Sequence, residues 1–220
     1  MSLALAEKID GYIEMCKRDP VNSAARNRCS YTMWNDQSLA VQAKAFLSDF
    51  AGGAVDVVVL DPSAEGGMPH TRAGPLICIP AYHTGLEETL RHEMVHIQQR
   101  REPALWKMKM ELDGWKHLAD SAIPEVWRRR CRINPDTCEA RWFAWQGRHV
   151  PLPLFVREDK PDLRDIVVRW YDIEEGIVKS VPSSFSKRYG ELGVSSMEHP
   201  YELWAYKGIR GLYFKKLALT

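Results

Sequence analysis

Apolar residues recur at helical spacing in several parts of this chain. Around the middle of the sequence they fall three or four positions apart, which on a helix places them on one face: Leu86, Leu90, Met94 and Ile97. Thr84 or Gly85 can begin this helix. Pro103 ends it, because proline lacks the amide hydrogen that a helix interior needs. The pattern therefore predicts an amphipathic helix with one face against the core.

The same periodicity predicts further core-packing helices at residues 3–18, 37–50, 104–121 and 200–217. Residues 134–144 predict one more. Asn134 is a good N-cap, Pro135 suits the first helical position, and Asp136 favours the positive end of the helix dipole.

Two stretches before the central helix have the composition of buried strands. Residues 55–60 are β-branched and apolar, and residues 76–79 form a second, shorter apolar run. The stretch between them, 63–75, is rich in glycine, proline and polar residues and predicts a loop. Residues 150–155 are extended and proline-rich, and residues 165–173 predict another strand. This mixture of helices and strands indicates an α+β fold.

Five consecutive residues of the central helix carry the candidate chemistry: His92-Glu93-Met94-Val95-His96, which has the form H-E-x-x-H. Residues four apart lie on one helix face, one turn apart, so the two imidazoles can bind a single Zn²⁺. Glu93 lies between them and can reach a metal-bound water. Both histidines flank the apolar stripe, which would place them in a cleft at the edge of the core. The sequence therefore predicts a zinc site.

Catalytic zinc usually has three protein ligands and a fourth position for water, so one more ligand must come from elsewhere in the chain. We favour Glu139, which would lie about one turn into the helix predicted at 134–144. Trp142 and Phe143 supply apolar packing that could hold that helix against the first.

Other residues compete for the third position. Glu202, near the start of the helix predicted at 200–217, is the main alternative, and its segment faintly resembles the glutamate helix of some metallopeptidase toxins. Glu102 occupies the position of the last ligand in the metzincin pattern, but Gln99 replaces the glycine that this pattern needs. His117 and His149 are the remaining alternatives.

The central helix also resembles a known family. Residues 92–101 (HEMVHIQQRR) look like the active-site helix of zincin metallopeptidases. Asn134-Pro135, followed by Glu139-Ala140-Arg141, is similar to the element that carries the glutamate ligand in gluzincin-type members. Many members have a further glutamate two residues before that ligand, where this chain has Thr137.

The resemblance covers roughly residues 55–145. It implies a zincin-like fold, with a small mixed sheet packed on the active-site helix and further helices, and a C-terminal appendage. It also implies His92, His96 and Glu139 as zinc ligands and Glu93 as catalytic base.

Peptide hydrolysis at such a site follows from the metal. Zn²⁺ lowers the pKa of its bound water to about 7, and Glu93 would accept the proton as the water attacks the peptide carbonyl. A further donor normally stabilises the charge that develops on the carbonyl oxygen. Tyr82, Arg141, His149 and Tyr201 are all candidates, and the sequence does not choose among them.

Composition adds limits on partners and compartment. The net charge is +1, which gives no reason to expect nucleic acid or an anionic membrane as partner. No apolar run approaches a membrane span, and the first residues lack a secretory signal, so we expect a cytoplasmic protein. The five cysteines are odd in number and include no C-x-x-C pair, which favours free thiols. A bridge between Cys16 and Cys29 stays open.

We therefore predict a zinc metallopeptidase domain at residues 1–147. A C-terminal extension at 148–220 would pack on that domain or bind a protein partner. The substrate would be a peptide or protein, and the cofactor Zn²⁺. The alternative is a degenerate zincin-like module that uses zinc for structure or protein interaction. A non-peptidase hydrolase with the same activated water is a further alternative.

Overall fold

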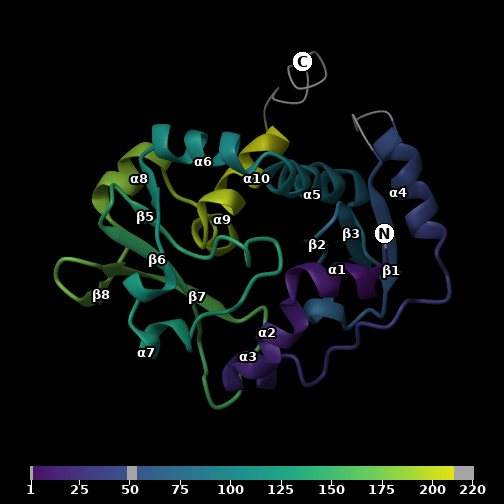
Figure 1. The fold of residues 1–220 in the computed structure, drawn as a ribbon, viewed down its shortest axis with the longest axis horizontal. Coiled ribbons are helices and arrows are strands. Elements are labelled where there is room, and N and C mark those ends of the chain that lie inside the picture. Colours follow the sequence, from purple (N-terminus) through teal and green to yellow (C-terminus); the bar gives the residue numbers. More distant parts are fainter. Residues whose placement is uncertain (1, 49–53, 211–220) are drawn as a thin grey trace.

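Ten α-helices and two β-sheets make up the described part of the chain, residues 2–48 and 54–210 of a computed structural model (Figure 1). The helices are α1 (Leu3–Asp10), α2 (Tyr12–Arg18), α3 (Pro20–Ala25), α4 (Ser38–Ser48), α5 (Leu86–Arg101), α6 (Pro103–Leu112), α7 (Glu125–Arg128), α8 (Ser183–Tyr189), α9 (Val194–Met197) and α10 (Pro200–Arg210). The strands are β1 (Asp56–Leu60), β2 (His70–Arg72), β3 (Leu76–Pro80), β4 (Trp115–His117), β5 (Phe143–Trp145), β6 (His149–Phe155), β7 (Ile166–Asp172) and β8 (Ile177–Lys179). The expected α+β class is confirmed.

The smaller sheet has the order β1-β3-β2 and is mixed. Strand β3 pairs in parallel with β1 and antiparallel with β2, which lies at the edge. The strands expected at 55–60 and 76–79 are β1 and β3. The intervening stretch is not wholly a loop, because it contains the short strand β2 and a single 3-10 turn, η1 (Ala64–Gly67). The small mixed sheet implied by the resemblance is therefore present.

Helix α5 packs its predicted apolar face on this sheet. Leu90, Met94 and Ile97 are buried in one core cluster together with β1 and β3, and Leu86 packs against its edge. Helix α4 adds Ala43 and other small residues to the same cluster. The hydrophobic stripe in the sequence therefore determined which face of α5 turns inward.

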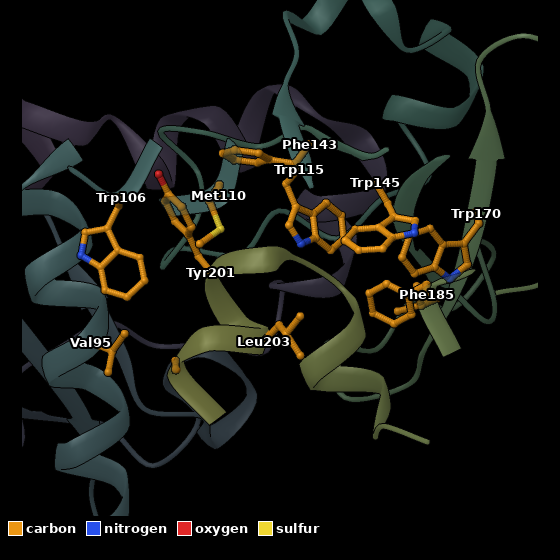
Figure 2. Close-up of a cluster of buried hydrophobic side chains, with 12 residues drawn as sticks. Val95, Trp106, Met110, Trp115, Phe143, Trp145, Trp170, Phe185, Tyr201 and Leu203 are labelled. Carbon is orange, nitrogen blue, oxygen red and sulfur yellow. The ribbon is translucent and has the colours of Figure 1, made fainter. Parts of the chain in front are cut away.

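The larger sheet is antiparallel, with its five strands in the order β4-β5-β6-β7-β8. An aromatic core joins one of its faces to α5, α6, α8 and α10 (Figure 2). Its largest members are Trp106, Trp115, Phe143, Trp145, Trp170, Phe185 and Tyr201. Figure 1 shows α9 and α10 between the two sheets, and α10 buries Tyr201, Leu203 and Ala205 there.

The prediction of a helix at 134–144 is wrong. The chain makes a turn there, and Phe143–Trp145 then pairs as strand β5 with β4. The Asn134 side chain does accept the amide of Asp136, as an N-cap would, but only a local turn follows. Gln146 and Gly147 both have positive φ and close a tight β5–β6 connection, so pairing in the sheet overrides the local helix signal.

Two other helix predictions need smaller corrections, and two extend beyond the described residues. The helix expected at 3–18 is divided at Gly11, whose φ of 58° ends α1. The helix expected at 104–121 stops at Leu112, and β4 follows after Gly114. The part of the helix expected at 200–217 that extends beyond α10 falls outside the described residues, as do positions 49 and 50.

The proposed division after residue 147 runs between two neighbouring strands of one sheet. Strands β5 and β6 pair through Trp145 and His149 on either side of that boundary. The division into two domains therefore stays a prediction. All five cysteines are free thiols, so the structure has no Cys16–Cys29 bridge. None of the helices in the described ranges has the length and apolar character needed to cross a bilayer.

We expect Gly114→Ala to lower the free energy of unfolding by about 2–3 kcal/mol. Gly114 has a φ of +95°, and a Cβ there would lie 3.1 Å from the Trp145 ring. Gly147→Ala is the matched control, because its φ is +69° but a Cβ would meet nothing within 4 Å. It should cost only about 1 kcal/mol. Urea unfolding measures both, and equal losses would show that the contact with Trp145 contributes nothing.

Candidate metal centre

Three side chains from two helices converge between the sheets. His92 and His96 project from α5, and Glu202 projects from the first turn of α10. The two histidine Nε2 atoms are 3.0 Å apart. Glu202 Oε2 lies 3.3 Å from His92 Nε2, and Oε1 lies 3.6 Å from His96 Nε2. One donor atom from each residue lies within 4.8 Å of the others, so the group could hold a metal ion.

The two histidines differ in exposure. The His96 side chain is fully buried, whereas 13% of the His92 side chain remains exposed. Their positions four residues apart put them one turn apart on α5, as the sequence predicted. The site therefore opens to solvent on the side of His92 and is closed behind His96.

Hydrogen bonds of His199 anchor the start of helix α10, the part of the helix that carries Glu202. His199 Nδ1 accepts the amide of Tyr201 at 3.1 Å, and its Nε2 donates to the carbonyl of Ala140 at 2.8 Å. Burial lowers the pKa of His199 to about 4, so the ring is neutral and keeps both roles. Pro200 starts the helix at a position where proline costs no hydrogen bond. Glu202 then falls in the first turn, where the dipole favours a carboxylate.

A buried polar network fixes the Glu202 carboxylate. Asn134 Nδ2 donates to Glu202 Oε1 at 2.8 Å and to Glu198 Oε1 at 2.7 Å. Arg132 Nη2 donates to both oxygens of Glu198, at 2.7 and 2.6 Å. The segment that was expected to supply the ligand Glu139 therefore contributes Asn134 as a support for Glu202.

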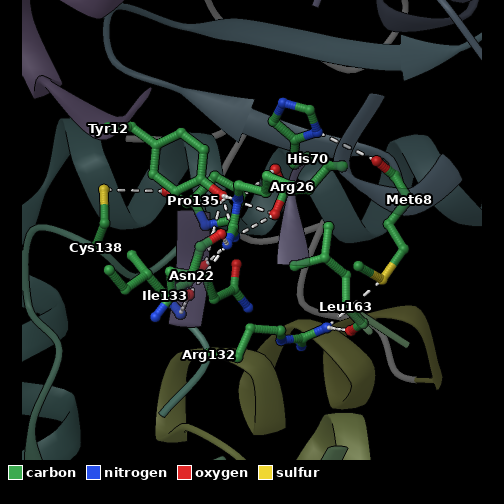
Figure 3. A network of polar contacts seen from close by, with 12 residues as sticks. Tyr12, Asn22, Arg26, Met68, His70, Arg132, Ile133, Pro135, Cys138 and Leu163 are labelled. Carbon is green, nitrogen blue, oxygen red and sulfur yellow. Dashed lines mark hydrogen bonds and ion pairs between the residues drawn. The ribbon is translucent and has the colours of Figure 1, made fainter. Parts of the chain in front are cut away.

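Side chains of the N-terminal helices hold the segment that carries Arg132 and Asn134 (Figure 3). Asn22 donates to the carbonyl of Cys131 and accepts the amide of Ile133, both at 2.9 Å. Arg26 donates to the carbonyl of Ile133 at 2.7 Å and pairs with the buried carboxylate of Glu65. The N-terminal helices thus hold in place the short stretch that holds Glu202.

The hydrogen bonds of His96 suit a metal ligand. Gln99 Nε2 donates to the carbonyl of Tyr201, which leaves Gln99 Oε1 facing His96 Nδ1 at 2.7 Å. Since an amide oxygen can only accept, Nδ1 carries a proton, and in the neutral ring Nε2 keeps its lone pair toward Glu202. Such a partner behind a ligating histidine is common in metal sites. The donor set and its support therefore fit a divalent metal.

Charge in the metal-free group is balanced by protons. Burial acts to lower the pKa of His96, but the Glu202 and Asp136 carboxylates outweigh it and raise that pKa to about 10. Burial acts to raise the pKa of the Glu202 carboxyl, but the two histidines outweigh it and hold that pKa well below the usual range. The metal-free group therefore contains a buried imidazolium–carboxylate pair, and a metal must displace its proton.

A cavity of about 330 Å³ lies beside the group and is lined by His92, Glu93 and Glu202. The Glu93 side chain is buried, and its Oε2 has no hydrogen-bond partner. Burial and the nearby Asp136 carboxylate raise the pKa of Glu93 well above its usual value, although His96 opposes the shift. The structure thus places the residue between the two histidines at the wall of a cavity large enough for part of a substrate.

The structure does not bring Glu139 into this group. Its side chain is 48% exposed and lies 3.6 Å from Arg100, whereas Glu202 stands beside the histidines. Glu102 is exposed at the end of α5, and His117 is exposed on β4. His149 lies on β6 near Asp172.

None of the four expected oxyanion donors lines the cavity in the described part of the chain. Tyr82 is 77% exposed, Tyr201 is buried in the aromatic core, Arg141 lies over the Trp142 ring, and His149 is on β6.

Tyr206 and His70 are among the cavity residues that the sequence reasoning missed. Tyr206 lies one turn beyond Glu202 on α10, and its ring packs edge-on against His92 at 4.6 Å between centroids. His70 lies on β2, within a stretch that was expected to be a loop. Tyr206 could have been found from its spacing to Glu202, which puts both on one helix face. Nothing local in the sequence singles out His70.

Comparison of the chain with known protein families, curated proteins and solved structures found no match. The structure shows a His92, His96 and Glu202 group that could hold a metal ion within an α+β fold, and membership of the zincins stays a prediction.

We expect Glu202→Gln to weaken Zn²⁺ binding by at least about 100-fold, because loss of a charged ligand should cost at least as much as loss of a group supporting one. Glu139→Gln is the matched control and should change the affinity less than about threefold, since an exposed ion pair contributes little. Competition with a chelator of known affinity measures both. A larger loss of Zn²⁺ affinity for Glu139→Gln than for Glu202→Gln would instead indicate Glu139 as the third ligand.

Zn²⁺ binding should also release protons, because His96 with a pKa of about 10 is protonated at neutral pH and must lose that proton to bind. The apparent affinity should therefore rise with pH, by up to about tenfold per unit for each proton displaced. Calorimetric titration at pH 7 in two buffers of different ionisation enthalpy gives the number released. Identical heats in both buffers would contradict the buried imidazolium.

Proposed function

We propose that this protein is a zinc-dependent hydrolase that cleaves peptide bonds. The observation that carries the proposal is the position of Glu93. Glu93 follows His92 in the chain, its carboxylate is buried with Oε2 lacking a partner, and it lines the same cavity as His92 and Glu202. A buried polar atom without a partner is costly, so its retention here favours a role in binding or catalysis.

The donor set supports zinc as the metal. Two imidazoles and one carboxylate match a known arrangement of catalytic zinc, which leaves a further position for water or substrate. A site for calcium or magnesium would be built mainly from oxygen ligands. When bound, Zn²⁺ would lower the pKa of a coordinated water to about 7 and polarise the substrate carbonyl.

Glu93 would move the proton in this reaction. Burial raises the pKa of its carboxyl and so makes the carboxylate a stronger base, which can accept a proton from the attacking water and later donate it to the leaving amine. His96 is held in one orientation by Gln99, and Glu202 by Asn134, so neither must reorganise during the reaction. Tyr206 lines the cavity beside His92, and we propose it in place of the earlier candidates as the donor near the carbonyl oxygen.

The C-terminal segment belongs to the proposed active site. Helix α10 supplies Glu202 and Tyr206, and its residues Tyr201, Leu203 and Ala205 lie in the aromatic core. A partner-binding role for this segment is therefore not needed to explain its presence.

We expect Glu93→Gln to lower kcat/KM on peptides by about 100- to 10,000-fold while the protein still binds one Zn²⁺, because the amide cannot accept the proton. A quenched fluorescent peptide library measures turnover, and elemental analysis measures metal. Glu102→Gln, at the exposed end of the same helix, is the control and should retain full activity.

Two results would contradict the proposal. Equal turnover by the wild type and Glu93→Gln would show that Glu93 is not the base. Metal binding without turnover in either protein would indicate a module that holds zinc for structure or interaction.

A further inference from the structure

The cavity beside the metal centre is lined by six carboxylates, and three of them have a basic partner. Glu65 pairs with Arg26, Glu198 pairs with Arg132, and Glu202 lies against the histidines. Glu93 is the proposed base. Two acidic residues remain, Asp136 and Glu88, and neither forms an ion pair with any residue in the described ranges.

Asp136 is fixed in place with one oxygen engaged. Its Oδ1 accepts the amide of Thr71 at 2.5 Å and the Thr71 hydroxyl at 2.8 Å. No described residue donates a hydrogen bond to its Oδ2, and Asp136 lines the cavity. A rigid, half-buried carboxylate thus stands beside the reactive residues.

His70 adds a second acceptor at the same wall. Its ring is 1% exposed, and Nδ1 donates to the carbonyl of Met68 at 3.2 Å (Figure 3). Because a carbonyl can only accept, the proton of the neutral ring is on Nδ1, and Nε2 is left with a lone pair. That Nε2 is buried without a partner, and His70 lines the cavity. A buried acceptor without a donor indicates that something else supplies the donor.

Glu88 lies at the exposed end of the same cavity. It precedes His92 by one turn on α5, so its carboxylate is on the metal-binding face of that helix. Glu87 is its neighbour on the chain but does not line the cavity. Among the described residues, three acceptors without a donor therefore line the cavity: Asp136 Oδ2, His70 Nε2 and the Glu88 carboxylate. Arg132 Nε is a lining donor that also lacks a partner among them, but its guanidinium is paired with Glu198.

We propose that this part of the cavity binds a cationic group of the peptide substrate, an ammonium or guanidinium held by Asp136, with His70 and Glu88 as further acceptors. This inference rests on the proposed peptide hydrolysis and names its substrate class. An ammonium offers three donors and a guanidinium five, and neither competes with the acceptors by bringing lone pairs of its own. The cation would come either from a lysine or arginine side chain or from a free amino terminus.

A second metal ion is the less suitable occupant. The group of histidine and carboxylate donors that is close enough to share an ion, within the described ranges, is His92, His96 and Glu202. Asp136, His70 and Glu88 form no such group.

The experiment compares peptides that differ only in charge. The zinc-loaded protein is given quenched fluorescent peptides with lysine against norleucine, and arginine against citrulline, at each position around the cleaved bond. Each peptide is made with a free and with an acetylated amino terminus. We expect kcat/KM to be at least about tenfold higher with the cation at one position, which corresponds to about 1.4 kcal/mol. Loss of the preference on acetylation would identify the amino terminus as the source, and its persistence a side chain.

Three variants test which residues cause the preference for cationic peptides. Asp136→Asn should reduce the charge preference at least fivefold, and its amide oxygen can still accept both groups of Thr71, so the fold is retained. Glu88→Gln should reduce the preference by a smaller factor because it is more exposed. Glu87→Gln is the matched control and should leave it unchanged. An unchanged preference in both Asp136→Asn and Glu88→Gln would overturn the proposal.

A binding measurement separates this inference from the proposed function. Calorimetry with the Glu93→Gln protein compares the affinity for lysine and norleucine peptides without any need for turnover. Tighter binding of the lysine peptide, with no hydrolysis by the wild type, would support the cation site and reject the hydrolase. Hydrolysis by the wild type with equal rates and equal binding for both peptides would reject the cation site and leave the hydrolase standing.

Discussion

The burial of Glu202 against two histidines is the interaction on which the rest of the site depends. A carboxylate removed from water is costly unless charges and hydrogen bonds replace its hydration. Here His96, whose pKa is raised to about 10, provides the charge, and Asn134 provides a hydrogen bond. The same three donor atoms that compensate one another without a metal are those that could bind one.

This requirement explains why segments far apart in the chain meet behind the metal centre. Asn134 can support Glu202 only if the stretch around it is fixed. Asn22 and Arg26 fix it by bonding to the backbone of Cys131 and Ile133. Glu198 adds a second buried carboxylate, and Arg132 neutralises it with two hydrogen bonds. Partly satisfied polar networks are unstable, so each member requires the next.

Helix α5 connects this polar centre to the two hydrophobic cores. Leu90, Met94 and Ile97 belong to the core of the small sheet, and Val95 belongs to the aromatic core of the larger sheet. The histidines lie on the remaining face. Since residues on opposite sides of α5 are held by separate cores, the ligand geometry is set by packing on both sides and not by the metal alone.

The sequence by itself determined the features that depend on neighbours a few residues apart. Helical spacing fixed the apolar stripe of α5 and the common face of His92 and His96, and β-branched runs gave β1 and β3. Only the tertiary structure decided that Glu202, and not Glu139, stands beside the histidines. Both glutamates follow a proline at an apparent helix start. The pairing of Phe143–Trp145 with β4 drew the first segment into a sheet, whereas the aromatic core held the second against α5. Such contacts join residues that are distant in sequence, and local propensity contains no information about them.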